Sequence, residues 1–347
     1  MPVQWQDYLT VPGGKAVYCE CHRRCRGAFE RQREIIGSVL DKTNPNVVAC
    51  LGAGILNDIP YRRMVRSGAT IHLVDWLPGI TDAGIDWSII ERDEDGAARC
   101  VFCTLSEDRS AAYCRRFTGD GGSDAEVCGS FVAGKGSPFL CTAFEKGTQP
   151  ICHTADVTGG YASAFAERVL DAVGDARSWK SAFGRAIALA NRVSRQRTNL
   201  GIPDASVDLV TSSMLVSQFD HEPYDYFSWQ VAEVLGPPTA KEERRLEPAV
   251  QRLRATLRTN QFDGHCDEIE RILAPGGYCF MSFEMFVLDA AASRWILVKE
   301  MHEVLGLLAR RFSFAFDILP EHELFARFVG QKAASVVCSL VLQARGG

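Results

Sequence analysis

The feature that most constrains this chain is a buried strand that ends in a glycine turn and is followed by a helix and a second strand. Residues 47–60 read V-V-A-C-L-G-A-G-I-L-N-D-I-P, and residues 71–76 read I-H-L-V-D-W. Gly52 and Gly54 tolerate the positive φ that such a turn needs and let a ligand approach the backbone, because glycine has no Cβ. The helix that follows offers free N–H groups at its start. Asp75, at the tip of the second strand, is placed to accept hydrogen bonds from a ribose diol. These parts predict a nucleoside-binding βαβ unit.

Composition narrows the class of protein and its surroundings. The chain has 347 residues, a net charge of −5 and 46% hydrophobic residues, which suits one large or two ordinary globular domains. The charge gives no general attraction to nucleic acid or to an anionic membrane. No apolar run approaches the roughly 18 residues of a membrane span. Residues 1–10 lack the basic start and apolar core of a signal peptide. We expect a cytoplasmic protein without nucleic-acid or membrane partners, and the oligomeric state stays open.

Strand and helix patterns alternate along most of the chain. The strands are expected at residues 46–51, 71–76, 150–157, 207–212 and 278–283, with a closing antiparallel pair at 312–319 and 335–343. The helices are expected at residues 26–41, 57–67, 162–173, 179–193, 263–273 and 295–310. Such alternation predicts a doubly wound α/β fold with a mostly parallel seven-stranded sheet. The last strand is antiparallel.

Two stretches break this alternation, residues 77–149 and residues 220–260. The second is mostly helical and charged, with a Pro237-Pro238 interruption. Residues 1–45 form an expected N-terminal helical extension. Residues 77–149 separate the second and third strands and are rich in Gly, Asp, Ser and Cys, with little apolar periodicity. The chain is therefore expected to divide into that extension, an α/β domain made of residues 46–76 and 150–347, and a cysteine-rich insertion.

Three further motifs follow the glycine turn in a recognisable order. A-D-V stands at 155–157, D-L-V-T-S-S at 208–213 and L-A-P-G-G at 273–277. They resemble the third strand, the fourth strand and the post-catalytic motif of class I S-adenosylmethionine-dependent methyltransferases. The resemblance covers roughly residues 45–76 and 150–345. It implies a Rossmann-like domain that binds S-adenosyl-L-methionine and transfers a methyl group to a small-molecule acceptor.

The same resemblance assigns cofactor contacts to individual residues. They are Gly52 and Gly54 under the methionine and ribose, Asp75 on the ribose hydroxyls, Trp76 beside the adenine, Asp156 and Val157 on the adenine, and Ser212, Ser213 and Met214 beside the sulfonium. The family usually has an acid two residues before the first glycine, and here that position is Cys50. Asp58 either contacts the ammonium group of the cofactor instead or caps the helix. Acids such as Asp75 and Asp156 have a structural alternative, since each could simply end a strand.

Candidate bases lie just beyond the fourth and fifth strands. Residues 218–227 read Q-F-D-H-E-P-Y-D-Y-F and include His221, Glu222, Tyr224 and Tyr226, while Glu284 ends the fifth strand. His221 has a near-neutral ordinary pKa and suits a general base, although a solvent-exposed loop histidine looks the same. The tyrosines suit either a wall around the sulfonium, through cation–π contact, or the core. No N-P-P-Y or D-P-P-Y tetrad follows the fourth strand, which argues against methylation of base amino groups in nucleic acid.

The chain has thirteen cysteines. Those inside apolar strands are expected to be small buried residues: Cys50, Cys152, Cys279 and Cys338. The insertion contains C-V-F-C at Cys100 and Cys103, a spacing that chelates zinc and iron–sulfur clusters. With Cys128 and Cys141, each in a Cys-x-x-Phe setting like Cys114, the layout faintly resembles high-potential iron–sulfur proteins. That likeness implies Cys100, Cys103, Cys128 and Cys141 around a 4Fe-4S cluster, with a structural zinc or free thiols as the alternatives. Cys19, Cys21, His22 and Cys25 form a second group of candidate ligands, either for a metal of their own or for the same site.

Two other functions compete with methyl transfer. An NAD-dependent oxidoreductase also uses a glycine turn, but Asn57 replaces the third glycine of the dinucleotide fingerprint. In the methyltransferase interpretation, Asn57 belongs to the cofactor turn. The other alternative is a non-catalytic protein that senses an adenosyl compound or a metal.

Overall fold

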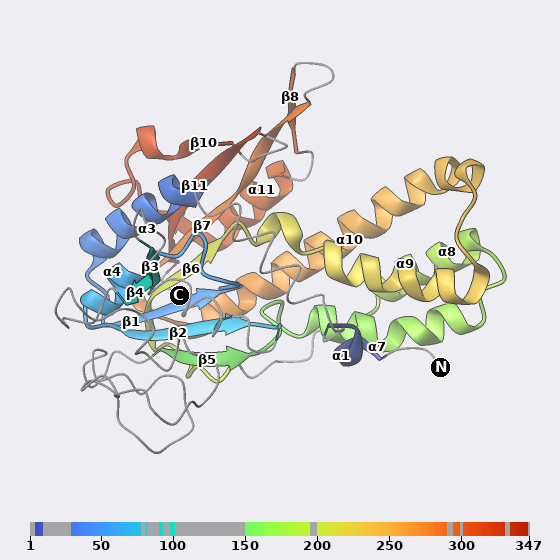
Figure 1. Ribbon diagram of the computed structural model, residues 1–347, viewed down its shortest axis with the longest axis horizontal. Coiled ribbons are helices and arrows are strands. Elements are labelled where there is room, and N and C mark those ends of the chain that lie inside the picture. Colours follow the sequence, from blue (N-terminus) through green and yellow to red (C-terminus); the bar gives the residue numbers. More distant parts are fainter. Residues whose placement is uncertain are drawn as a thin grey trace.

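The computed structural model describes residues 4–9, 29–77, 81, 90–92, 98–100, 150–194, 200–289, 294–298, 301–329 and 334–345. Within these ranges the chain forms a twisted nine-stranded sheet in the order β10-β11-β7-β6-β1-β2-β5, with β8 pairing with β7 and β9 pairing with β11 (Figure 1). The strands of this sheet are β1 (Val47–Leu51), β2 (Thr70–Asp75), β5 (Ile151–Thr154), β6 (Val207–Ser213), β7 (Leu273–Asp289), β8 (Arg294–Leu297), β9 (Phe312–Phe314), β10 (Phe325–Val329) and β11 (Ala334–Ala344). A separate hairpin pairs β3 (Ile90–Arg92) with β4 (Ala98–Cys100).

Strand directions confirm the predicted mixed sheet. β1 lies parallel to both β2 and β6, β2 lies parallel to β5, and β6 lies parallel to β7. β11 is antiparallel to both β7 and β10. The sheet has nine strands rather than the predicted seven: seven follow one path, and β8 and β9 pair beside it.

The strand count and several element boundaries differ from the expectation: β7 extends over 273–289, β5 ends at Thr154, and α10 begins at Ala240 and ends at Ile272. The apolar residues of 294–297 form β8, paired with the end of β7, and the helix predicted at 295–310 begins at Met301. β10 was not predicted as a strand, and it takes the edge position beside β11. An apolar run this short is compatible with either a helix or a strand. Whether it forms a strand therefore depends on the presence of a neighbouring strand with which it can pair.

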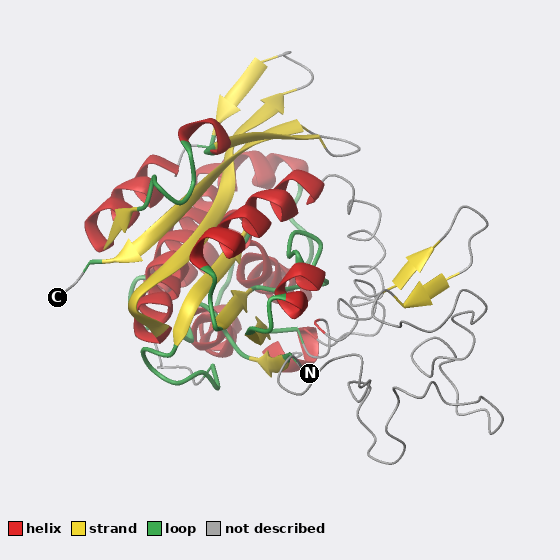
Figure 2. Ribbon diagram, turned by 90° about the vertical axis from the view of Figure 1, so that its left-hand side faces the viewer, coloured by secondary structure: helices red, strands yellow, loops and turns green. Residues whose placement is uncertain are grey.

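Helices cover both faces of the sheet (Figure 2). α3 (Glu30–Thr43) and α4 (Tyr61–Arg66) pack on one face, where they meet Val48 and Cys50 of β1. The second half of α10 (Ala240–Ile272) and α11 (Met301–Arg311) pack on the other face, with Ala49 and Leu51. Successive residues of a strand point to opposite faces, so the run V-A-C-L of β1 is apolar throughout because it is buried on both sides.

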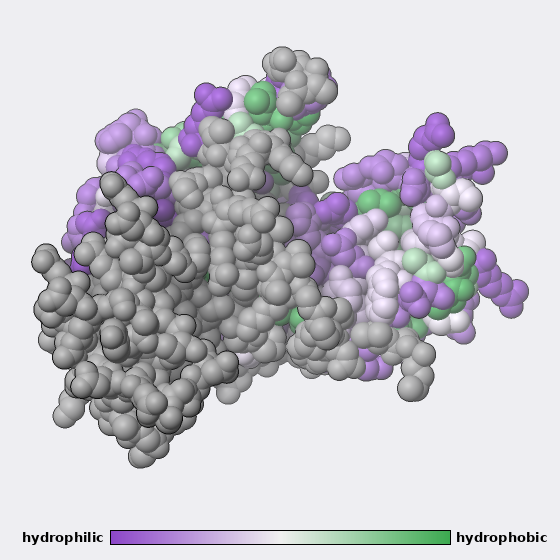
Figure 3. Space-filling model, in the orientation of Figure 1, coloured by the Kyte–Doolittle hydropathy of each residue, from purple (hydrophilic) through white to green (hydrophobic). Residues whose placement is uncertain are grey.

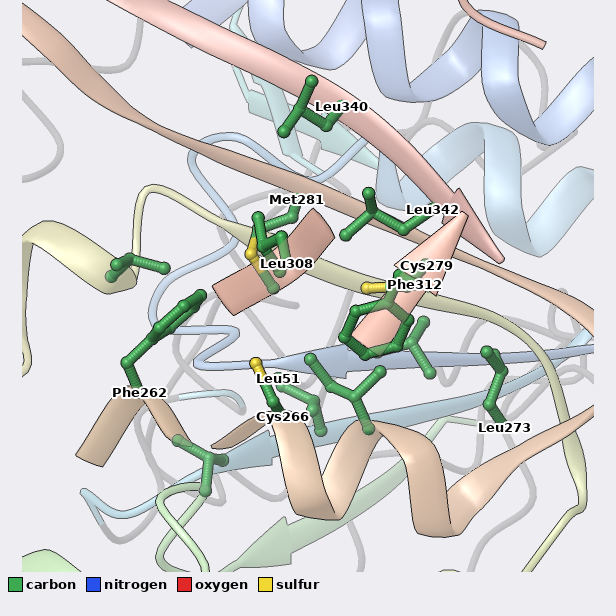
Figure 4. Packing of buried hydrophobic residues seen from close by; sticks show 14 of the residues in the cluster. Leu51, Phe262, Cys266, Leu273, Cys279, Met281, Leu308, Phe312, Leu340 and Leu342 are labelled. Atoms are coloured by element: carbon green, nitrogen blue, oxygen red, sulfur yellow. The ribbon is translucent and has the colours of Figure 1, made fainter. Parts of the chain in front are cut away.

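The core between the sheet and α10 is drawn in Figure 4. Cys279 and Met281 of β7 and Cys266 of α10 are fully buried there, with Leu308 and Phe312. The expected buried cysteines are confirmed for Cys50, Cys279 and Cys338, and Cys152 is half-buried.

A bundle of helices extends beyond the carboxyl ends of the strands (Figure 1). It comprises α1 (Trp5–Leu9), α7 (Tyr161–Gly174), α8 (Trp179–Ala190), α9 (His221–Leu235) and the first half of α10. We call this bundle the helical arm. Its own core includes Phe165, Phe183 and Leu253, and polar side chains cover much of its outer surface (Figure 3). α10 starts with a capping box formed by Thr239 and Glu242 and runs for 33 residues into the sheet domain.

Among the described helices, none combines the length and the apolar character that crossing a membrane requires.

Candidate active site

A cavity of about 570 Å³ opens at the carboxyl ends of the central parallel strands. This is the edge at which open α/β sheets bind ligands. The wall comprises the glycine turn after β1, the end of β2, the turn after β5, the end of β6, and residues of α1, α9 and α10. The cavity therefore lies between the sheet and the helical arm, and its volume suits a small molecule.

The glycine turn has the backbone geometry that its sequence predicted. Gly52 and Gly54 have φ angles of 68° and 49°, and Leu56 adopts a positive φ of 59° as well. A Cβ at Gly52 would stand 2.7 Å from Cδ1 of Leu215, which itself lines the cavity. Glycine is therefore required here both by its φ and by the close approach of a neighbouring chain segment.

The helix after this turn begins later than expected. It was predicted at 57–67, but α4 starts at Tyr61, after Pro60. Proline disfavours the helical conformation at the residue before it and is suited to a helix start. Asn57 and Asp58 consequently belong to the turn, where both line the cavity. The capping position of α4 is Pro60, so Asp58 does not cap the helix.

Asp75 joins the end of β2 to the glycine turn. Its Oδ2 accepts a hydrogen bond of 2.9 Å from the Gly54 N–H, and its Oδ1 accepts one of 2.9 Å from the Leu77 N–H. Burial raises the pKa of this carboxyl, and these backbone N–H groups act in the opposite direction. Trp76 also lines the cavity. A carboxylate held in this way keeps lone pairs available for hydroxyl donors of a ligand.

Asp58 is a second carboxyl group on the cavity wall. Burial raises its pKa to about 6, against a hydrogen bond from Ser213 and the positive charge of Arg33. The guanidinium group of Arg33 itself donates to the backbone carbonyl of Asn57. Ser213, which also lines the cavity, lies 3.1 Å from Ser282 between their hydroxyl oxygens.

On the opposite wall, a buried histidine links the turn after β5 to the end of β6 through hydrogen bonds. Nδ1 of His265 lies 2.8 Å from the Val157 carbonyl oxygen, and its Nε2 lies 2.8 Å from the Ser212 hydroxyl. Val157 lines the cavity. Ser212 and His265 are fully buried beneath the wall. His265 was not identified from the sequence, because it lies on α10 and belongs to none of the quoted motifs.

Asp156 does not line the described cavity. Its Oδ2 accepts hydrogen bonds from the backbone N–H and the hydroxyl of Ser163, at 2.9 and 2.8 Å, and its Oδ1 accepts one of 2.8 Å from the Thr158 N–H. The carboxylate therefore holds the turn after β5 and the first turn of α7. Asp156 thus has the structural role that the sequence left open for it, at the end of a strand. Its neighbours Val157 and Thr158 do line the cavity.

Of the five candidate bases, the structure brings His221 and Glu222 to the cavity. Tyr226 is fully buried, with its ring centroid 5.2 Å from that of Trp5. Tyr224 packs beneath the guanidinium of Arg254, at 5.2 Å. Glu284 lies in the interior of β7, opposite Val337 of β11. The two tyrosines thus follow the core-packing alternative, because α1 covers Tyr226 and an arginine covers Tyr224.

Several cavity residues were not predicted as site residues. They include Tyr8 and Leu9 of α1, Phe29, Leu77, Thr158, Leu215, Trp229 and Gln261, none of which belongs to a motif quoted from the sequence. Gln218 and Phe219 also line the cavity, and they stand with Glu222 in the stretch 218–227 that holds the candidate bases. Helical spacing relates Glu222 to Trp229, since residues seven apart share a helix face.

The cavity wall carries negative charge. Asp58, Asp75 and Glu222 line it, and no lysine or arginine does so in the part of the chain that the structure describes. Burial raises the pKa of Glu222, as do the nearby carboxylates of Asp225 and Asp75. Burial likewise raises the pKa of Tyr8 to about 12, with Glu222 and Asp225 adding to the effect. Anionic ligands are disfavoured at such a wall, and cationic ligands are favoured.

The predicted metal ligands fall almost entirely outside the described residues. Cys103, Cys128 and Cys141 lie there, as do Cys114, Cys19, Cys21 and Cys25, and Cys100 ends β4. Within the described ranges, no three His, Cys, Asp or Glu side chains are grouped to hold a metal ion.

No protein-family model and no curated protein sequence matches the chain. Among solved structures, it is similar to the PH0226 protein from Pyrococcus horikoshii OT3, with 9% identity, a TM-score of 0.36, and coverage of 92% of this chain and 91% of that one. It is also similar to an O-methyltransferase family protein from Burkholderia thailandensis, with 9% identity and a TM-score of 0.36. In that case the match covers 100% of this chain and 65% of the other. Likenesses this distant assign neither fold nor function.

Proposed function

We propose that the protein is an S-adenosylmethionine-dependent methyltransferase of the class I type that acts on a small molecule. The observation that carries the proposal is the charge of the cavity at the carboxyl ends of the strands. Asp58, Asp75 and Glu222 line it without a lysine or arginine among the described residues. S-adenosylmethionine carries a sulfonium and an ammonium group, and both are stabilised by nearby carboxylates.

The same charge argues against a dinucleotide. The pyrophosphate of NAD is an anion, and dinucleotide folds hold it at the N-terminus of the helix that directly follows the glycine turn. Here α4 begins only at Tyr61, and Asp58 stands in the turn where the phosphates would lie. The turn therefore fits a cationic nucleoside better than an anionic one.

The residues present fit the proposed cofactor. Asp75 would accept from the ribose hydroxyls, since its two oxygens are already oriented by backbone N–H groups. Asp58 would pair with the ammonium group in the role that Cys50, fully buried in β1, does not fill. Trp76 and Val157 would enclose the adenine, and Gly52 and Gly54 would pass beneath the ribose and methionine.

When bound, the cofactor supplies a methyl carbon that bonds to the acceptor atom as its bond to sulfur breaks, the electron pair staying on sulfur. The protein has to align the acceptor and take up its proton. His221 is the cavity residue best suited to accept that proton. Ser213 and Met214, at the exit of β6, form the wall beside the glycine turn. Apolar and aromatic side chains, including Phe219 and Trp229, line the same cavity.

The proposal is tested by titration calorimetry with S-adenosylhomocysteine and with NAD⁺. We expect the first to bind and the second not to bind. Asp75→Asn is expected to weaken S-adenosylhomocysteine binding about 10- to 100-fold, because it removes a charged acceptor of hydrogen bonds. Asp175→Asn, at an exposed residue paired with Arg185, is the matched control and should leave the affinity unchanged.

Tighter binding of NAD⁺ would contradict the proposal and favour an oxidoreductase. Binding of S-adenosylhomocysteine without methylation of any compound in a metabolite pool would favour the sensor alternative.

The proposal also includes a metal held by cysteines of the insertion, which rests on the C-V-F-C motif at 100–103 together with Cys114, Cys128 and Cys141 in the sequence after it. Metal stoichiometry of anaerobically purified protein tests it, together with an absorption spectrum. Iron with a broad band near roughly 400 nm would indicate a cluster. One zinc without colour would indicate a structural site, and no metal would contradict this part of the proposal.

A further inference from the structure

Aromatic residues gather on one side of the cavity, between α1 and α9. Tyr8 and Trp229 both line it, with their ring centroids 5.9 Å apart. Trp5 of α1 contacts Trp76, with the ring centroids 5.4 Å apart. α1 thus connects the aromatic end of β2 to α9. Ring faces of this kind attract organic cations, tryptophan most strongly.

Glu222 supplies a carboxylate beside this aromatic wall. It lines the cavity one residue after the start of α9, and its charge is close enough to affect the titration of Tyr8. If Asp75 and Asp58 bind the proposed cofactor, Glu222 is the one acidic residue among these three without a cofactor contact, so it is available to a second ligand. The nearby arginines do not line the cavity: Arg254 pairs with the buried Asp220, at 2.5 Å, and Arg33 contacts the Asn57 carbonyl.

Gln261 provides an independent sign of a polar ligand. Its side chain is fully buried, it lines the same cavity, and within the described part of the molecule neither its amide nitrogen nor its amide oxygen has a hydrogen-bond partner. A buried amide without partners costs about 1–3 kcal/mol. Such a group fits a site where a ligand with both a donor and an acceptor completes the hydrogen bonds.

We infer that this side of the cavity binds an organic ammonium group, with Glu222 as its counter-ion and Tyr8 and Trp229 as its aromatic wall. This inference rests on the proposed function and specifies it, since it makes the methyl acceptor a small amine. The attacking nitrogen must be neutral, so the ammonium form first gives a proton to a carboxylate or to His221. Its lone pair then forms the new nitrogen–carbon bond.

The test is calorimetric titration of the full-length protein, without cofactor, with three probes of one shape. Benzylammonium is a cation, benzyl alcohol is neutral, and benzoate is an anion. We expect affinity in that order, with no measurable benzoate binding. Glu222→Gln should weaken benzylammonium about tenfold or more, since charged hydrogen bonds contribute about 1.5–3 kcal/mol. It should leave benzyl alcohol unaffected.

Glu233→Gln is the matched control. Glu233 is an exposed residue of the same helix, it does not line the cavity, and its substitution makes the same change of charge. Benzylammonium should bind this variant as it binds the unsubstituted protein. Equal or tighter binding of benzyl alcohol or benzoate, or an unchanged benzylammonium affinity in Glu222→Gln, would overturn the inference.

The inference and the proposed function fail separately. Binding of S-adenosylhomocysteine without benzylammonium binding would leave a methyltransferase whose acceptor is not an amine. Benzylammonium binding without S-adenosylhomocysteine binding would leave a cation site and contradict the proposed function.

Discussion

The hydroxyl group of Ser212 lies 2.8 Å from Nε2 of His265, whose Nδ1 lies 2.8 Å from the carbonyl oxygen of Val157. A carbonyl only accepts hydrogen bonds, so Nδ1 carries the proton and Nε2 accepts from the serine. The neutral imidazole therefore holds the end of β6 and the turn after β5 in a fixed relation, and both border the cavity. Burial lowers the pKa of His265 to about 4.

Acid should weaken the folded state through this histidine. Its ordinary pKa of 6.5 applies in the unfolded chain, so between pH 6.5 and about 4 the native protein binds fewer protons and its stability falls as pH falls. The loss is about 3 kcal/mol across that window. His265→Gln should lower the unfolding free energy at pH 7.5, with a gap to the unsubstituted protein that narrows at pH 4.5. Urea unfolding at the two pH values measures this, and the exposed His322→Gln should show a constant gap.

Asp58→Asn should have the opposite pH dependence. A carboxyl whose pKa is raised from 3.8 to about 6 binds protons more tightly in the native state, so its contribution to stability falls as pH rises through that interval. The variant should therefore be more stable above pH 6, by at most about 2 kcal/mol because Asp58 is partly exposed, and no different below pH 4. Urea unfolding at pH 7.5 and 3.8 checks both values.

Asp58→Asn should weaken ligand binding, although it stabilises the folded protein above pH 6. If ionised Asp58 pairs with the ammonium group, S-adenosylhomocysteine binds the unsubstituted protein more weakly as pH falls below 6. Asp58→Asn should bind weakly at every pH, with that dependence removed. A pH dependence of the affinity that persists in the variant would assign the titrating group elsewhere.

Gln261→Leu should raise the stability of the protein and weaken its binding of a ligand. Replacing an unpartnered buried amide with an apolar group of similar size is expected to stabilise the protein by about 1–3 kcal/mol. Benzylammonium binding should weaken if the amide serves a ligand. Gln230→Leu is the matched control, since Gln230 is also buried but does have an interaction partner, so its loss should destabilise. Thermal unfolding compares the two, and a destabilised Gln261→Leu would show that the amide is already satisfied.

Gly52→Ala should lower the free energy of unfolding more than Gly68→Ala does. Both glycines have positive φ angles, 68° and 77°, where alanine is strained by about 1–2 kcal/mol. A Cβ at Gly68 meets nothing within 4 Å, whereas one at Gly52 meets Leu215 at 2.7 Å. The first variant should therefore lose stability and S-adenosylhomocysteine affinity, and the second should lose stability alone. Equal losses in urea unfolding would mean that the turn can shift away from Leu215.

The central parallel strands were predictable because their buried positions carry runs of apolar residues, as V-V-A-C-L of β1 does throughout. β1 and β6 begin at or within one residue of the expected position and end within one residue of it. β8 was missed because its residues, Arg294–Leu297, carry no periodicity that separates a strand from a helix. Its pairing with the far end of β7 is a tertiary contact, which local propensity does not encode.

The candidate site was predictable only where its residues follow strands. Gly52, Asp75 and Ser213 stand at strand ends, and the edge of the sheet collects them into one cavity. Tyr8 and Gln261 reach it because α1 and α10 pack there, and nothing in their local sequence indicates it. The expectation that Tyr226 lines the site was wrong for the same reason, because α1 packs over its ring. Trp229, less than one turn further along α9, lines the cavity instead.

α10 joins the helical arm to the sheet as one uninterrupted helix of 33 residues, with Gln261 in its second half. Each residue of a helix turns the chain by about 100° and advances it by about 1.5 Å. An insertion or deletion of one residue between Pro248 and Gln261 would therefore swing the outer part of the arm to another side of the molecule. A change of length in the connection at 236–239 would be absorbed locally. In the evolutionary history of this chain, we expect the first kind of change to be rare and the second to be common.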